Sequence, residues 1–328
     1  MNSKAKNILK FVFSFLLAAV FVWFAFRKVD WSDFVSGLRL TRWAWIALFA
    51  VCSIAAVVLR MLRWRGMLKP IGCESGSLRI WDAANIGNLV NVVLPGAGEL
   101  VRCGYVTGGK ASYEKVFGTV LMERAWDMLA IAVLLFSSVF IGWSKFGSFF
   151  VENIWRPASG RFDLSLGWII LIVLLLVALG VWIIFRRSSK SKFCASVADA
   201  WRGFAQGFVS FTKMEHKWAF GAYTVGIWAM YILMSYCAIK AVPEIAGLGF
   251  ADALFISAVG NIASVIPVPG GIGAYHYLIA LVLSSLYGGS WETGILFATL
   301  NHESHAILII ILGVISYIRI SVSKKCSV

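Results

Sequence analysis

The stretch Pro267-Val268-Pro269-Gly270-Gly271-Ile272-Gly273-Ala274-Tyr275-His276 lies between two apolar runs, each too short to cross a bilayer. Helix-breaking residues at membrane depth are tolerated only where the backbone is buried in protein or lines a watery cavity. An earlier stretch, Leu94-Pro95-Gly96-Ala97-Gly98-Glu99-Leu100-Val101-Arg102, interrupts an apolar segment in the same way. Two interrupted segments, one in each half of a chain, are typical of transporter-type sites.

The composition indicates an integral membrane protein. Of the 328 residues, 60% are hydrophobic and 14% are charged, which excludes an ordinary soluble domain. The formal net charge of +14 arises from Lys and Arg in short runs beside apolar segments. This pattern indicates membrane topology and attraction to anionic headgroups, so we expect no nucleic-acid partner. The six cysteines show no CxxC or metal-ligand spacing, and we infer neither disulfides nor a metal from them.

We predict an all-α polytopic membrane protein that forms a single domain over residues 1–328. About six full transmembrane helices are expected, at residues 11–26, 43–62, 116–143, 164–185, 218–239 and 293–318. Two inverted re-entrant helical hairpins are expected, the first from 80 to 105 around Pro95-Gly96 and the second from 251 to 286. Residues 27–42 are expected to form a short loop. Residues 193–211 are expected to form an amphipathic helix in the membrane interface, with a plain linker helix as the alternative.

Basic clusters predict the orientation. Lys and Arg gather at 4–10, 60–69, 186–192 and 319–325, so the positive-inside rule places both termini in the cytoplasm of a protein of the plasma (inner) membrane. The two hairpins then enter from opposite sides. An inverted repeat, with halves of roughly 1–143 and 164–328, would give this arrangement.

Three motifs occur in order along the chain: Pro95-Gly96-x-Gly98-Glu99-x-x-Arg102, Glu123-Arg124-x-x-Asp127 and Pro267-x-Pro269-Gly270-Gly271-x-Gly273. In order and spacing they resemble the lysylphosphatidylglycerol synthase transmembrane region, also called the flippase-like domain family, over nearly the whole chain. The resemblance implies a polytopic domain with re-entrant hairpins that moves lipids between leaflets.

The chain departs from the family pattern in its polar residues. Family members often carry Glu shortly after the second Gly-rich turn, where this chain has His276, and Arg in the last span, near His302 and Glu303. The identity of the substrate is therefore not carried over. Lipid-aminoacylating members also have a soluble aminoacyltransferase domain after the membrane region. This chain ends at Val328, so we do not expect the synthase activity.

The Gly-rich turns are the first candidate site. A turn that opens a helix presents free backbone N–H groups and the positive end of the helix dipole, which suit a lipid phosphate. Alternatively, the glycines only permit a tight turn and close helix packing. Arg102 lies one turn after Glu99, so it either pairs internally or contacts phosphate. Glu123 and Asp127 share a helix face and are expected to brace the first hairpin rather than to touch substrate.

The histidines form the second candidate site. His302-Glu303-Ser304-His305 reads HExH rather than HExxH, so we expect no metal. A buried hydrogen-bonded cluster and a protonatable group that couples transport to a proton gradient remain open. The predicted lipid-headgroup cavity is lined by Pro95, Gly96, Gly98, Glu99, Arg102, Arg124, Pro269, Gly270, Gly271, Gly273, His276, His302 and Glu303.

We predict a flippase-like transporter of an anionic lipid, either a phospholipid or a polyprenyl phosphate. No cofactor and no enzymatic activity are expected, because no nucleotide-binding or catalytic motif occurs in the sequence. One alternative is a membrane-embedded enzyme that uses Glu99, His276 and Glu303 as acid and base. Another is an accessory subunit that presents lipid to a lipid-modifying partner enzyme. The lipid, the direction, the energy source and the oligomeric state remain open.

Overall fold

The computed structural model describes residues 3–108, 111–143, 151, 156, 214, 216–263 and 268–325. These residues form helices and contain no strand, apart from an isolated bridge between Gly108 and Ala111. The fourth predicted span (164–185), the predicted interfacial helix (193–211) and Pro267 lie outside the described residues.

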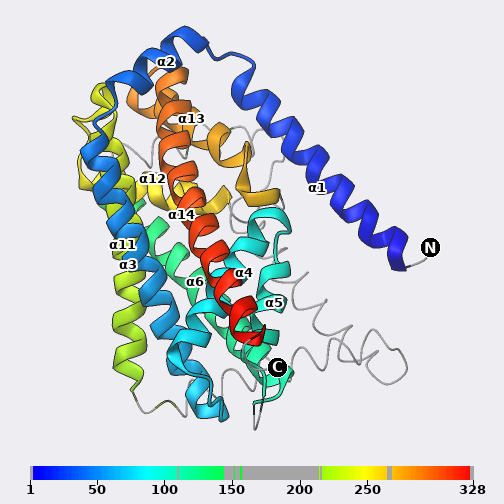
Figure 1. Ribbon diagram of the computed structural model, residues 1–328. Helices are drawn as coiled ribbons and strands as arrows, with labels where there is room; N and C mark the ends of the chain where they lie inside the picture. Colours follow the sequence, from blue (N-terminus) through cyan, green and yellow to red (C-terminus); the bar gives the residue numbers. More distant parts are fainter. Residues whose placement is uncertain are drawn as a thin grey trace.

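Figure 1 shows most of the described helices as a bundle, from which α1 extends away towards the N-terminus. The α-helices are α1 (Ser3–Phe26), α2 (Trp31–Leu40), α3 (Trp43–Leu68), α4 (Ser77–Val93), α5 (Ala97–Val106), α6 (Tyr113–Ile141), α11 (Lys217–Ala241), α12 (Phe250–Ile262), α13 (Ala274–Tyr287) and α14 (Trp291–Lys325). Short 3-10 helices lie at η1 (Lys69–Ile71), η4 (Pro243–Ile245) and η6 (Pro269–Gly271).

Five described segments are long and apolar enough to cross a membrane: Trp43–Ile71, Tyr113–Ile141, Lys217–Ala241, Pro269–Tyr287 and Trp291–Ser323. Four of them coincide with predicted spans. Pro269–Tyr287 joins η6 to α13 and corresponds to an arm of the predicted second hairpin. In α1 the side chains are described from Phe15 onwards, and Phe15–Phe26 is a shorter apolar segment. The chain is an integral membrane protein, and the count of six spans with two re-entrant hairpins stays a prediction.

The loop predicted at residues 27–42 is wrong, because most of it is the helix α2. Asp30 caps this helix: its Oδ1 accepts the N–H groups of Ser32 (2.8 Å) and Asp33 (3.4 Å). A side-chain cap of this kind satisfies backbone donors that the first helical turn leaves unpaired. The Asp-Trp-Ser-Asp sequence thus starts a helix between the first two apolar segments.

The two hairpins enter the bundle from opposite ends. The Arg42 N–H donates to the Ala241 carbonyl (2.9 Å), so the start of α3 lies beside the end of α11. The α4–α5 hairpin follows the far end of α3, whereas the α12–α13 hairpin follows the near end of α11 (Figure 1). Their turns meet inside the bundle. A Cβ added at Gly270 would lie 3.5 Å from the Val92 carbonyl oxygen at the end of α4.

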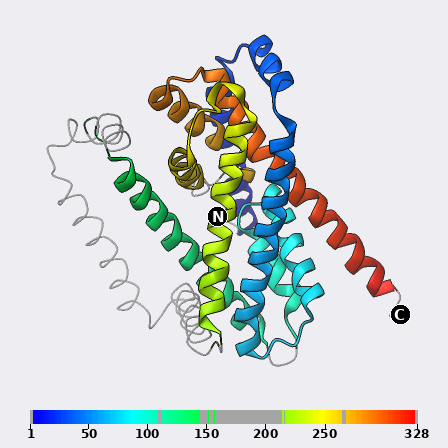
Figure 2. The same ribbon diagram turned by 90° about the vertical axis from the view of Figure 1, so that its left-hand side faces the viewer.

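Helix α14 packs against both hairpins as it crosses the bundle towards the C-terminus (Figure 2). Near its start it packs on α13, where a Cβ at Gly294 would lie 2.6 Å from the Ala280 Cα. Farther along, a Cβ at Gly313 would lie 3.0 Å from the Asn85 carbonyl oxygen of α4. Arg319 then pairs with the buried Asp82 of α4, donating from Nε at 3.0 Å and also from Nη2.

Helix α1 meets the rest of the described protein mainly at the second hairpin. Gly273, with φ of 81°, precedes α13, and a Cβ there would lie 2.6 Å from the Val22 nitrogen and 2.9 Å from the Phe21 carbonyl carbon. The indole N–H of Trp291 donates to the Ala25 carbonyl (2.8 Å). The backbone of α1 therefore approaches the second turn so closely that only glycine fits at position 273.

The first hairpin closes through a similar glycine contact. A Cβ at Gly87 in α4 would lie 2.8 Å from the Gly98 carbonyl oxygen, and a Cβ at Gly98 in α5 would overlap the Gly87 carbonyl oxygen. Gly96, with φ of 79°, turns the chain between the two arms. Small residues at such a contact let two helical backbones approach closely.

We expect Gly98→Ala to destabilise the protein by about 1–3 kcal/mol or more, because the added methyl group cannot be accommodated without parting α4 from α5. Gly104→Ala, in the same helix, is the matched control. A Cβ at position 104 meets no described atom within 4 Å, and alanine favours the helix. Thermal unfolding in detergent would measure both variants, and equal midpoints for the two would contradict the contact.

Candidate functional site

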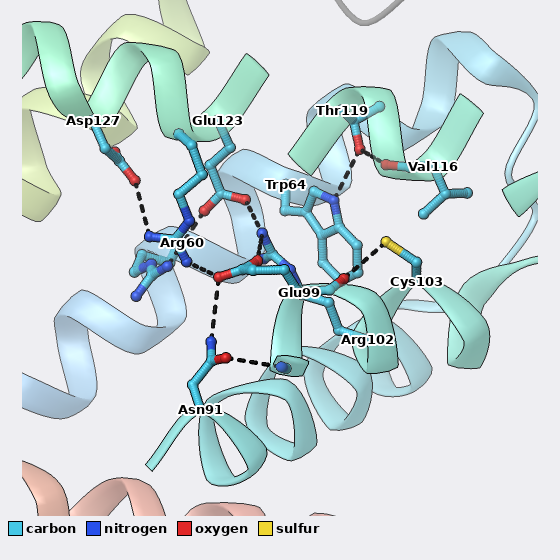
Figure 3. A network of polar contacts seen from close by, with 12 residues as sticks. Arg60, Trp64, Asn91, Glu99, Arg102, Cys103, Val116, Thr119, Glu123 and Asp127 are labelled. Carbon is cyan, nitrogen blue, oxygen red and sulfur yellow. Dashed lines mark hydrogen bonds and ion pairs between the residues drawn. The ribbon is translucent and has the colours of Figure 1, made fainter. Parts of the chain in front are cut away.

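A network of ion pairs joins four helices beside the turn of the first hairpin (Figure 3). Its members are polar residues that face one another across the helix interfaces: Arg60 and Arg63 of α3, Asn91 of α4, Glu99 and Arg102 of α5, and Glu123, Arg124 and Asp127 of α6.

Glu123 lies at the centre of this network and is completely buried. Its Oε1 accepts from Arg63 Nη2 (3.1 Å), and its Oε2 accepts from Arg102 Nη2 (2.8 Å). Arg60 Nη2 lies 3.6 Å from Oε1. Burying a carboxylate among apolar helices is costly unless it is paired and hydrogen-bonded. The converging arginines supply this pairing.

The remaining carboxylates extend the network. Asp127 Oδ1 lies 2.8 Å from Arg63 Nη2, Glu99 Oε2 lies 2.7 Å from Arg102 Nη2, and Arg124 Nη2 donates to Glu99 Oε1. Among the described residues the network therefore holds four guanidinium groups and three carboxylates. One positive charge is in excess.

The four arginines differ in exposure. The Arg63 and Arg102 side chains are 0% and 7% exposed, and Arg102 also lies over the Trp64 ring, 4.6 Å from its centroid. Arg60 and Arg124 are 21% and 39% exposed. Arg102 is thus committed to two carboxylates and an indole, whereas Arg60 and Arg124 lie at the accessible rim.

Asn91 binds the turn that follows it. Its Oδ1 accepts the Gly98 N–H (2.8 Å), and its Nδ2 donates to Glu99 Oε1 (3.3 Å). The Gly98 N–H, which the sequence suggested as a phosphate donor, is therefore bonded within the protein. Pro95 and Gly96 form the turn between α4 and α5, and they lie beside the network because they are next to Gly98 and Glu99 in the chain.

A second polar cluster forms where the turn of the second hairpin meets α14. His302 Nε2 lies 2.7 Å from the Gly270 carbonyl oxygen, and its Nδ1 lies 2.9 Å from Glu303 Oε1. His276 Nε2 lies 3.7 Å from the same carboxylate oxygen. The buried Pro269 and the positive-φ glycines Gly270, Gly271 and Gly273 shape this turn. Within the described part of the chain, no group of three metal-ligating side chains is placed to hold an ion.

Polar residues also lie between the two clusters. His305, one turn beyond His302 on α14, bonds through Nδ1 to the Ser53 hydroxyl of α3 (2.7 Å). Arg60 follows Ser53 by two turns on the same helix, and the ring of Tyr231 packs edge-on to His305 (6.4 Å between centroids). Ser53 and His305 therefore lie between the second cluster on α14 and Arg60 on α3.

The structure brings together every described residue that the sequence marked as a site, but in two groups rather than one. Reasoning from sequence missed Arg60 and Arg63, which were assigned to a cytoplasmic basic cluster. A signal was available, because Arg60 lies inside the predicted span at 43–62 and Arg63 follows it by one turn. Such an intramembrane cation normally faces protein and has a partner.

We expect Glu123→Gln to destabilise the protein by about 3–5 kcal/mol, because the amide leaves buried arginines without their counter-charge. Glu114→Gln, an exposed glutamate on the same helix, is the matched control and should unfold at the wild-type midpoint. Chemical unfolding in detergent would measure both. A Glu123→Gln protein as stable as the control would show that the network contributes nothing to the fold.

The sequence also matches known proteins. Residues 8–313 match the family described as the lysylphosphatidylglycerol synthase TM region. The chain is similar to the glycosyltransferase AglD of Haloferax volcanii, with 25% identity over 336 aligned positions that cover 92% of this chain and 53% of that protein. The chain thus spans about half the length of this curated relative. Because the family match covers most of the sequence and includes both polar clusters, the chain belongs to the family of the lysylphosphatidylglycerol synthase TM region.

Proposed function

We propose that this protein is a flippase-like transporter that moves an anionic lipid between membrane leaflets. The lipid is a phospholipid or a polyprenyl phosphate, whose headgroup passes through the polar interior while its chains stay in the bilayer. The excess positive charge of the ion-pair network is the observation that carries this proposal.

An uncompensated cation inside an apolar bundle is unfavourable, and intramembrane charges normally find a partner. The described residues supply three carboxylates for four arginines. A lipid phosphate would supply the missing anion. Guanidinium groups suit this role, because their donors match phosphate oxygens in pairs.

The exposure of the arginines assigns their roles in this proposal. Arg60 and Arg124 at the rim contact the phosphate, whereas Arg63 and Arg102 keep the network folded with Glu123 and Asp127. The headgroup then follows His305, His302 and Glu303 to the second turn. There, α13 starts after Gly273, and its N-terminus carries the positive end of the helix dipole.

The position in the membrane is part of the proposal. The basic clusters support a cytoplasmic position for both termini, in a protein that we propose lies in the plasma membrane. The opposed entry of the two hairpins supports inverted-repeat halves with a site near the midplane, where the turns meet. Alternating access would then consist of movement of one hairpin against the other.

A second candidate function is that of an accessory membrane module for an enzyme that acts on lipid. Similarity to about half of a protein named as a glycosyltransferase, and a family named for a synthase, favour this alternative. In that case the same polar interior would hold the lipid for a partner enzyme rather than release it to the other leaflet.

We expect proteoliposomes containing the protein to exchange fluorescent anionic phospholipids or a polyprenyl phosphate between leaflets. Arg60→Gln and Arg124→Gln should each slow exchange by about 10- to 100-fold, because each removes one charge-assisted hydrogen bond to the phosphate. Arg60→Gln leaves three arginines for three carboxylates, so the protein should still fold.

Arg65→Gln, an exposed arginine of α3, is the matched control and should exchange at the wild-type rate. Equal rates in all four proteins would contradict the role of the network. Absence of exchange in the wild type, with anionic lipid still bound after purification, would favour the accessory module.

A further inference from the structure

The His302 ring is held between two hydrogen-bond acceptors. The Gly270 carbonyl oxygen, 2.7 Å from Nε2, can only accept, and an ionised Glu303 carboxylate, 2.9 Å from Nδ1, can also only accept. A neutral imidazole carries one N–H and cannot donate to both. The two bonds therefore require one additional proton, either on His302 as an imidazolium or on Glu303 as a carboxylic acid.

We propose that His302 and Glu303 form a proton-binding site that fastens the turn of the second hairpin to α14. With the proton bound, the pair makes both hydrogen bonds. When the proton leaves, the Nδ1 lone pair faces an anionic carboxylate, or the ring donates to Glu303 and releases the Gly270 carbonyl. Either change weakens the link between η6 and α14.

The surroundings define a route for the proton. The Glu303 side chain is 37% exposed, the His302 side chain 19% and the His276 side chain 3%. Glu303 is thus the accessible end of the cluster. His276, with its ring centroid 5.6 Å from that of His302, is the buried end. Its Nδ1 is buried and has no hydrogen bond to any described residue.

Few other titratable groups face this pair. From α13, Tyr275 packs on His302 (5.2 Å between centroids), but its hydroxyl is bonded to Asn301. From α14, His305 lies one turn away and is bonded to Ser53. Helix α1 contributes the Phe26 ring, which packs against His276, and α4 contributes the Val92 carbonyl near Gly270. Among the described residues, the one further ion-pair partner of the pair is therefore His276, whose Nε2 lies 3.7 Å from Glu303 Oε1.

The location of the link gives the proton a role in transport, and this part rests on the proposed function. The fastened turn is the one that touches the end of α4, where the two hairpins meet. Proton release would free the second hairpin to move against the first. One proton carried with one singly charged anionic lipid moves no net charge, so a pH gradient alone would drive the cycle.

The proton site can be tested without transport. In protein labelled with ¹⁵N in histidine and ¹³C in glutamate, solid-state NMR at pH 7 should show His302 with both ring nitrogens protonated, or Glu303 as a carboxylic acid. His302→Gln assigns the signals. A neutral His302 beside an ionised Glu303 would overturn the proposal.

Glu303→Gln keeps the hydrogen bond to His302 but removes the need for the additional proton, because the Gln amide can donate to Nδ1 of a neutral His302. In proteoliposomes, wild-type protein coupling one proton per lipid should shift the steady-state leaflet ratio by about tenfold per pH unit of gradient. Glu303→Gln should exchange lipid more slowly than wild type, because Glu303 lies on the proposed headgroup path and the variant keeps the link without a titrating proton, and its leaflet ratio should be the same with and without the gradient. Glu74→Gln, an exposed glutamate, should behave as wild type.

The NMR and proteoliposome measurements distinguish the proton site from the transport function. If the leaflet ratio of wild-type protein does not change with the pH gradient, the proposed coupling of proton to lipid is wrong. A proton on the pair by NMR, without any lipid exchange, would overturn the transport function and uphold the proton site.

Discussion

The buried Glu123 carboxylate determines how three helices meet. Glu123 belongs to α6, and its two carboxylate oxygens accept hydrogen bonds from Arg63 of α3 and Arg102 of α5. Apolar packing alone selects register weakly in a membrane, because lipid chains are as apolar as the side chains they replace. A buried charge selects register strongly, since any slip of one helix would leave it unpaired. The position of the first hairpin within the bundle follows from this constraint.

The two hairpins are held by interactions of different kinds. The first is held by the ion-pair network around Glu123, by Asn91 on its turn and by Asp82, which pairs with Arg319. The second is held to α14 by close packing at Gly294, by the Asn301 amide on the Tyr275 hydroxyl and by the bond between His302 and the Gly270 carbonyl. Helix α14 contacts both hairpins and therefore links one to the other.

Much of the architecture could be predicted from the sequence. The spans at α3, α6, α11 and α14 follow from the lengths of their apolar runs, and the two helix–turn–helix segments follow from Pro and Gly at their centres. The α2 helix was missed because its start depends on one capping carboxylate rather than on hydrophobic periodicity. The partition of the site into two clusters could not be predicted, since it depends on which helices face one another. Arg60 illustrates the difficulty. A basic residue near the end of a span is normally interpreted as a sign of membrane orientation, and the sequence does not show its partner on another helix.

The close approach of α1 to Gly273 has a consequence for the order of assembly. Residues 21 and 22 emerge from the ribosome early, but the glycine that receives their backbone is made about 250 residues later. Until Gly273 is made, this surface of α1 contacts lipid instead of the turn before α13. Helix α1 is therefore made early but packed late, and a nascent chain interrupted before the second hairpin would hold α1 at the bilayer only by that helix's own hydrophobicity.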